Sequence, residues 1–190
     1  MLFRSSLGVQ IHGGMGFIEE TGAAQHSRDA RITSIYEGTN GIQSIDLVTR
    51  KLAANGGASV SALLDELSGI VSKVEASNDP AFGTTGTKLR DALGSLERAS
   101  KWLLERVAAK PNDALAGATP YLRLFGSTLG GCMLAGEALA ARNIGDGDPQ
   151  RYVTLARFFA ENVSVQAASL ERTVMDGAEA VNGADAVLLA

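Results

Sequence analysis

The sequence predicts an all-α protein whose larger part is an antiparallel bundle of four helices. Apolar residues recur every three or four positions through four successive segments between residues 59 and 176, which places them on one face of each helix. Each segment ends at a proline or at a glycine-rich stretch, as helices in bundles with short connections do. An aromatic content of 5% and 22 glycines also favour closely packed helices over a β-sandwich.

The first bundle helix is expected to begin with Ser59 as its N-cap and to end before Pro80. Its apolar face comprises Val60, Leu63, Leu64, Leu67, Ile70, Val71 and Val74. The second helix ends before Pro111. Ser100 stands at one position of its apolar face where the spacing calls for an apolar residue. That face otherwise comprises Leu89, Leu93, Leu96, Leu103 and Val107.

The third helix is expected from Pro120 to about Arg142, with Thr119 as its cap. Its predicted apolar face comprises Leu122, Phe125, Leu129, Met133 and Leu139. Three internal glycines, Gly126, Gly130 and Gly136, each weaken the helix by about 1 kcal/mol relative to alanine. We expect another helix to come close at these glycines.

The fourth helix begins with Asp148 as its cap and Pro149 at its first position, after a turn at residues 145–147. Its apolar face comprises Val153, Ala156, Ala160, Val163, Ala167, Leu170 and Val174. The tail from residue 177 to 190 is expected to add a short helix. The Asn-Gly-Gly stretch within residues 54–58 reads as a joint, so the sequence predicts a first domain at 1–54 and a bundle domain at 59–190.

The first domain contains a glutamate, Glu37, between apolar residues and a glycine. Glu37 follows Ile35 and Tyr36 and precedes Gly38, so its carboxylate is expected to leave an apolar wall. Burial favours the neutral form of a carboxylate, and a glutamate tuned in this way can take a proton from carbon. Gly38 permits a sharp turn or the close approach of a ligand to the main chain.

A helix is expected to start at Asn40, with Gln43 as the reciprocal partner of its cap and with free N–H groups that offer a polar site. The glycine-rich stretch 13–16 does not fit the dinucleotide-binding pattern, because Glu19 stands at the position of the third glycine, so spacing alone indicates a loop. By spacing alone, a glutamate before a glycine is also most often a solvated loop residue.

Several classes of function find no support in the sequence. The net charge of −4 gives no electrostatic reason to bind nucleic acid or an anionic membrane. His12, His26 and Asp29 lack metal-ligand spacing, so no metal site is expected, and no nucleophile elbow of a serine hydrolase is present. Cys132 is the only cysteine and is expected to pack in the core, which favours a reducing compartment. With no apolar stretch long enough to span a membrane, we expect a cytoplasmic protein.

Three segments in order resemble the acyl-CoA dehydrogenase family. They are Gln10-Ile11-His12-Gly13-Gly14-Met15-Gly16-Phe17, then Arg28-Asp29-Ala30-Arg31-Ile32, then Ile35-Tyr36-Glu37-Gly38-Thr39 with Ile42-Gln43. The resemblance covers about residues 5–53. Residues 59–176 are similar in architecture to the helical domain appended in a larger subgroup, which includes 3-methylmercaptopropionyl-CoA dehydrogenase-like enzymes. The first domain would then be the last helices of the family's C-terminal catalytic domain.

The resemblance implies an FAD-dependent oxidation of an acyl-CoA to a trans-2-enoyl-CoA in fatty acid metabolism. Glu37 would be the base that removes the α-proton, and Gly38 would lie against the substrate. The stretch of Thr39, Asn40 and Gly41 would contact FAD. The stretch of Gln10, Ile11, His12, Gly13 and Gly14 would contact the FAD of a neighbouring subunit, which implies at least a dimer.

The resemblance further implies an electron-transfer flavoprotein as electron acceptor. A family member carries two further domains upstream, so we expect this chain to be the C-terminal part of a longer enzyme and to be inactive alone. The alternative is a non-catalytic helical module for association that derives from the same family.

Overall fold

The computed structural model describes residues 2–144 and 148–184, and every regular element in these ranges is helical. The chain divides into two compact units, residues 1–43 and residues 44–190. The first unit contains α1 (Leu2–Ile11), α2 (Gly14–Phe17), the 3-10 turn η1 (Glu19–Thr21) and α3 (Ala23–Ile32). Helix α4 (Asn40–Asp46) contains the boundary between the units.

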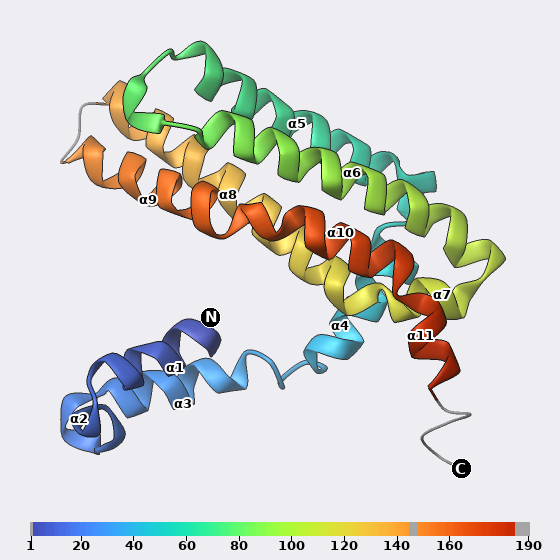
Figure 1. Ribbon diagram of the computed structural model, residues 1–190, viewed down its shortest axis with the longest axis horizontal. Coiled ribbons are helices and arrows are strands. Elements are labelled where there is room, and N and C mark those ends of the chain that lie inside the picture. The colour runs from blue at the N-terminus through green and yellow to red at the C-terminus, as the bar shows by residue number, and fades with distance from the viewer. Residues whose placement is uncertain (1, 145–147, 185–190) are drawn as a thin grey trace. The chain divides into compact units, whose positions relative to one another are not determined.

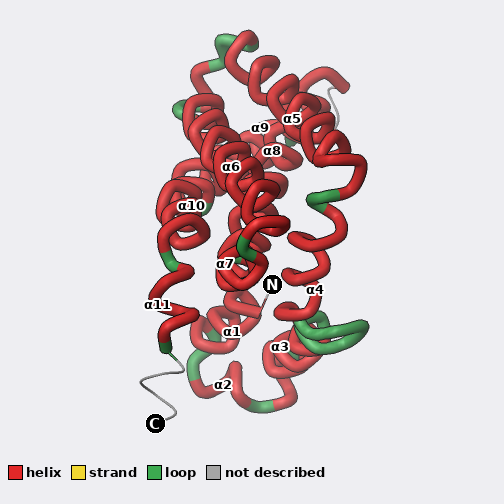
Figure 2. Tube along the Cα trace, turned by 90° about the vertical axis from the view of Figure 1, so that its right-hand side faces the viewer, coloured by secondary structure: helices red, strands yellow, loops and turns green. Residues whose placement is uncertain are grey.

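The second unit is the predicted helical bundle. Its long helices are α5 (Ala58–Ala76), α6 (Thr85–Ala109), α8 (Ala118–Ile144) and the pair α9 (Pro149–Asn162) and α10 (Ala167–Asp176). Short helical turns connect them: η2 (Leu47–Lys51), η3 (Ala54–Gly57), η4 (Pro80–Phe82), α7 (Pro111–Ala116), η5 (Ser164–Gln166) and α11 (Ala178–Gly183). Helix α8 packs against α5, α6, α9 and α10, and the loops that join the helices are short (Figures 1 and 2).

Two clusters of buried side chains hold the bundle together. One cluster joins α6 and α8 to α10 and to η2, and it is built around Tyr121, Leu96 and Leu103. Val48 and Leu52 belong to it, so the chain from η2 onward packs with the bundle. The other cluster joins α5, α6, α8 and α9 around Leu67, Leu89 and Val153.

Prolines and glycines end the helices largely where the sequence predicts. Asp148 caps α9 by accepting a hydrogen bond from the Gln150 N–H, and Pro149 occupies the first helical position. The stretch from Asn55 to Gly57 takes left-handed backbone angles and separates η2 from α5. The predicted turn at residues 145–147 lies outside the described residues.

Two predicted caps are wrong. Helix α5 begins at Ala58 with Gly57 in the cap position, and the Ser59 hydroxyl accepts instead from the Asn55 amide. Helix α8 begins at Ala118, so Thr119 lies inside the first turn, where its hydroxyl is 3.3 Å from that of Ser44. In both cases the helix takes in residues before the cap, which local sequence signals do not exclude.

The predicted apolar face of α8 is also wrong. The buried residues are Ala118, Tyr121, Leu124, Thr128, Gly131, Cys132, Ala135 and Ala138. Met133, predicted to be in the core, is 44% exposed, and the other predicted face residues are half-buried. Most of the buried side chains are small because four neighbouring helices, α5, α6, α9 and α10, pack against α8. The larger residues lie on its flanks.

The predicted fourth helix is interrupted. After α9 the chain forms the 3-10 turn η5 and resumes as α10, with Val153, Ala156, Ala160, Ala167 and Val174 still on the buried side. The expected short helix in the tail is present as α11.

Helix α8 alone has the length and hydropathy that would allow a described helix to cross a membrane. Its contacts with four bundle helices give it the place of a core helix, which accounts for the same composition.

Candidate active site

The candidate active site is the turn that follows α3, residues 34–43, which we call the Glu37 turn. The Tyr36 N–H donates to the Ile32 carbonyl at 3.1 Å, and the Asn40 N–H donates to the Ser34 carbonyl at 3.2 Å. These bonds close the chain back on itself between α3 and α4. Glu37 and Gly38 lie at the tip of the turn.

Glu37 has a strained backbone. Its φ of 54° lies in the left-handed region, where only two other non-glycine residues of the described chain, Asn55 and Asn78, are found. Asparagine tolerates this region, whereas a longer side chain there costs about 1–2 kcal/mol. The Gln43 side-chain amide donates to the Glu37 carbonyl at 2.7 Å and helps to hold the conformation. Strain of this kind concentrates at functional sites.

Gly38 continues the left-handed path with a φ of 92°. A Cβ at this position would lie 3.3 Å from Cγ2 of Ile42 and 3.4 Å from Nε2 of Gln43. Glycine is therefore required both by the backbone angle and by the close approach of α4.

The predicted cap at Asn40 is wrong, and Thr39 caps α4 instead. The Thr39 hydroxyl accepts from the Ile42 N–H at 3.4 Å, and its carbonyl accepts from the Gln43 N–H at 2.9 Å. Two N–H groups that the sequence suggested as a polar binding site are thus used within the chain. Gln43 reaches Glu37 rather than the backbone of a cap residue.

Glu37 itself is exposed, contrary to the expected apolar wall. Ile32, Ile35 and Tyr36 are each more than half exposed, so they do not enclose the carboxylate within this chain. Among the described residues, neither the carboxylate nor the N–H of Glu37 forms a hydrogen bond or ion pair. The main-chain donor and the carboxylate at the tip are both open to a ligand.

The segment from Gln10 to Gly14 connects α1 to α2, and all five of its residues are exposed. Gly13 has a φ of 60°, and no atom lies within 4 Å of a Cβ built at Gly13 or Gly14, so the main chain is open to a ligand. The expected loop is partly helical, because α2 covers Gly14–Phe17. Gly16 is required there, since a Cβ would collide with the Val9 carbonyl.

The first unit does not bring these two segments together. Helices α1 and α3 pack side by side, α2 joins them at one end, and the Glu37 turn follows the other end of α3 (Figure 1). Ten residues of α3 separate the ends by about 15 Å. One chain therefore presents the two sets of candidate residues at opposite ends of a helical hairpin.

The middle motif connects α3 to the turn that precedes it. Arg28 on α3 forms an ion pair with Glu19 at 2.6 Å, and the hydrogen bond to Glu19 is the main reason that the pKa of Arg28 is raised. Both side chains are more than half exposed, so the pair orients the turn before α3 more than it adds stability.

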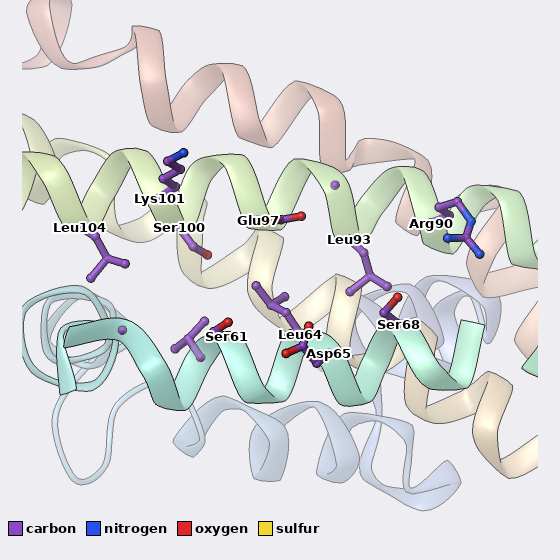
Figure 3. A pocket seen from close by; sticks show the side chains of 13 residues that line it. Ser61, Leu64, Asp65, Ser68, Arg90, Leu93, Glu97, Ser100, Lys101 and Leu104 are labelled. Carbon is purple, nitrogen blue, oxygen red and sulfur yellow. The ribbon is translucent and has the colours of Figure 1, made fainter. Parts of the chain in front are cut away.

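A separate groove lies in the bundle between α5 and α6, with a volume of about 380 Å³ (Figure 3). Leu64 and Leu93 from facing helices form its apolar walls, and Asp65 and Glu97 give it acidic groups. The sequence pattern does not predict this groove, because the residues that line it are spread over two helices. No described group of His, Cys, Asp or Glu could hold a metal ion.

Comparison with known families assigns both parts of the chain. Residues 4–52 match the family described as "Acyl-CoA dehydrogenase, C-terminal domain", and residues 60–185 match "Acetyl-CoA dehydrogenase C-terminal like". The chain belongs to the acyl-CoA dehydrogenase family. The resemblance predicted from the three motifs is confirmed, as is the all-helical fold.

The chain spans less than a third of the length of the relatives it matches. A 3-methylmercaptopropionyl-CoA dehydrogenase of Ruegeria pomeroyi is 37% identical over 90% of the chain, which covers 30% of that relative. A broad-specificity linear acyl-CoA dehydrogenase of Mycobacterium tuberculosis is 28% identical over 81% of the chain, which covers 27% of it. A human mitochondrial short-chain specific acyl-CoA dehydrogenase is 60% identical over 37 residues, 20% of the chain and 9% of the relative.

Proposed function

We propose that this chain is the C-terminal part of an FAD-dependent acyl-CoA dehydrogenase in which Glu37 is the catalytic base. The observation that carries the proposal is the strained, open tip of the Glu37 turn in a chain of this family. There a carboxylate and an unbonded main-chain N–H stand on one residue, held by Gln43.

Glu37 would take the proton from the α-carbon of an acyl-CoA thioester. Its N–H would donate to the thioester carbonyl, where negative charge develops as the C–H bond breaks. The flexible backbone of Gly38 beside it leaves room for the substrate. FAD, when bound, supplies the acceptor for the hydride that leaves the β-carbon, so the substrate loses a proton and a hydride and gains a C=C bond.

Cofactor contacts would come from both exposed segments of the first unit. Gly13 and Gly14 leave the main chain open, which suits the approach of an adenosine-diphosphate group, with Gln10, Ile11 and His12 beside them. Thr39, Asn40 and Gly41 would face the other part of a flavin. Since the two segments lie at opposite ends of the α1–α3 hairpin, we propose that they serve the flavins of two subunits, and hence a homo-oligomer.

The remainder of the enzyme would cover the first unit. Nine large apolar side chains of that unit are at least 36% exposed: Leu7, Ile11, Met15, Phe17, Ile18, Ile32, Ile35, Tyr36 and Ile42. So many on 43 residues indicate a surface that packs against other protein. Its burial would also enclose Glu37 and favour the neutral carboxyl that forms after proton transfer. We also propose cytoplasmic location and an electron-transfer flavoprotein as acceptor.

The test joins this chain to the upstream part of a full-length relative and compares Glu37→Gln with the unchanged sequence. We expect Glu37→Gln to keep the flavin absorbance. The rate at which acyl-CoA bleaches that absorbance should fall by at least about 10²-fold, because no base remains. Glu20→Gln, a change at an exposed glutamate whose carboxylate pairs with none of the described residues, is the matched control and should react normally.

Unimpaired bleaching in Glu37→Gln would show that the base lies elsewhere and would favour a non-catalytic association module. The 190-residue chain alone tests whether flavin binding needs the upstream part of the enzyme, as we propose. Stoichiometric flavin on the purified chain, measured by absorbance, would contradict that requirement.

A further inference from the structure

Helix α8 has a second face that the bundle does not use. Its members are spaced alternately by three and four residues and run along the side opposite the buried residues. They are Arg123, Gly126, Gly130, Met133, Glu137 and Ala140, all exposed except the half-buried Gly130. We call this set the outer stripe.

The glycines of the outer stripe are not explained by packing within the chain. A Cβ at Gly126 would meet no atom within 4 Å, and one at Gly130 would meet only Phe159, at 3.6 Å. Each glycine costs about 1 kcal/mol in a helix interior relative to alanine. Two glycines four residues apart on one face allow a second helix backbone to come close.

Apolar side chains border the same face. Met133 is 44% exposed, and Phe159 of α9 lies against Gly130. One and two turns before Phe159 on α9 are Leu155, 45% exposed, and Tyr152, 37% exposed. Helices α8 and α9 pack side by side (Figure 1), so these exposed apolar side chains of α9 lie on the helix that borders the outer stripe.

The two charges of the outer stripe would complement those of a second copy of the same helix. Arg123 and Glu137 each lie seven residues from Gly130, one on either side, about 10 Å along the helix axis. Neither forms an ion pair or hydrogen bond with any described residue. A second α8 that crosses antiparallel at Gly130 would place each Arg123 opposite the Glu137 of the other copy, twice.

We infer that the outer stripe is a two-fold interface between two copies of this chain, with the axis at Gly130. An isologous contact is self-complementary, which the opposite charges at equal distances provide. A lipid surface fits less well, since it would bury Arg123 and Glu137 without partners. The interface is independent of the flavin-linked contact proposed for the first unit.

The experiment measures the mass of the full chain by sedimentation from about 1 µM to about 1 mM. The unchanged chain is expected to move from 19.7 kDa towards twice that mass. Arg123→Glu and Glu137→Arg should each weaken the dimer about tenfold or more, because attraction becomes repulsion at two symmetric sites. The double variant should restore the dimer to within about threefold, since the pairs re-form with reversed sign.

Gly126→Leu should abolish the dimer by blocking the approach of the second helix. Gly69→Leu is its matched control, because Gly69 is also exposed within a helix and a Cβ there meets no atom within 4 Å. Glu66→Arg on α5 controls for the change of charge. Circular dichroism should show each variant to be as helical as the unchanged chain and no less stable, since replacement of an exposed helical glycine favours the helix.

A monomer throughout the concentration range would overturn the inference. So would a dimer that Arg123→Glu leaves intact, or one that the double variant fails to restore. Binding of the unchanged chain to neutral lipid vesicles, lost in Gly126→Leu without any dimer in solution, would assign the face to a membrane instead.

Discussion

At the scale of single residues, the structure shows the backbone conformation of the Glu37 turn, which the sequence identifies only by its residue types. Glu37 combines a left-handed backbone, an open carboxylate and an open N–H, while Thr39 and Gln43 use their own polar groups to hold the turn. Glu37 is thus the residue proposed to react, and Thr39 and Gln43 position it. Strain at a reactive residue predicts a conflict between stability and function.

We therefore expect Glu37→Gly to stabilise the Glu37 turn by about 1 kcal/mol while removing the proposed base, because glycine adopts a φ of 54° without strain. Amide hydrogen exchange at Asn40 and Gln43 should slow by about fivefold. Glu20→Gly serves as the control, since Glu20 lies in η1 without a positive φ, and glycine there should speed local exchange. Faster amide exchange at Asn40 and Gln43 in Glu37→Gly would show that the backbone of Glu37 is not strained.

At the scale of elements, small residues decide how closely the bundle helices pack. Gly131 lies on the buried face of α8, where a Cβ would be 2.6 Å from Cδ2 of Leu89 and 2.8 Å from the Ser164 hydroxyl. The expectation that glycines of this helix mark close approach is correct in kind, but the decisive residue is Gly131. A Cβ at Gly126, one of the three glycines expected to mark a close approach, would meet open space.

Gly131→Ala is expected to destabilise the bundle by about 1–3 kcal/mol, because the added methyl group would displace the buried Leu89 side chain and the Ser164 hydroxyl. The same change at Gly69, which faces open space on α5, should stabilise by about 0.5–1 kcal/mol through helix propensity. Urea unfolding followed by circular dichroism measures both. Equal effects of the two changes would show that the close contact at Gly131 is absent.

An ion pair connects α6 to α10. Arg98 donates two hydrogen bonds to Glu171, at 2.6 and 2.8 Å, and the Glu171 side chain is only 13% exposed. The hydrogen bond from Arg98 is the main reason that the pKa of Glu171 is lowered. A lowered carboxyl pKa contributes stability above the unfolded pKa of about 4.3, and this stability is lost as the pH falls through the folded value.

Glu171→Gln should therefore destabilise the chain at pH 7, by about 1 kcal/mol or less because Arg98 is 61% exposed. The difference from the unchanged chain should shrink below about pH 4. Unfolding free energies measured at both pH values check the sign. A difference that grows towards low pH would contradict the assignment.

At the scale of the whole molecule, the two units differ in how completely each buries its own apolar residues. The bundle encloses Tyr121, Leu96, Leu103 and Val153 at 0% exposure. The first unit leaves its isoleucines and Phe17 on the surface. The bundle is thus built to fold with its own core, whereas the first unit has the surface expected of a part that packs against more of an enzyme.

The reactivity of the Cys132 thiol measures how often the bundle unfolds. Its thiol is fully buried in the second cluster, and this burial raises its pKa to about 12. We expect a thiol reagent at pH 8 to modify Cys132 only as fast as the bundle unfolds, so that the rate follows urea unfolding. Fast modification of the native chain would show that α8 separates readily from its neighbours.

The sequence by itself determined the elements and the family. Prolines and glycines end helices through local backbone geometry, and apolar spacing identifies the core faces of α5 and α6. The order of three short motifs identified the acyl-CoA dehydrogenase family, because those residue types recur in that family at those positions. Glu37 as base and its cofactor-binding neighbours stay predictions.

Only the tertiary structure decided which face of α8 is buried, which glycine allows close packing, and that Glu37 is exposed and strained. These features depend on what neighbouring segments offer across space. On α8 the closest neighbours select the smallest side chains, so Gly131 and Ala135 are buried and Met133 is not. Hydrophobicity along one helix carries no information on how near the next helix will come, and that distance decides the packing.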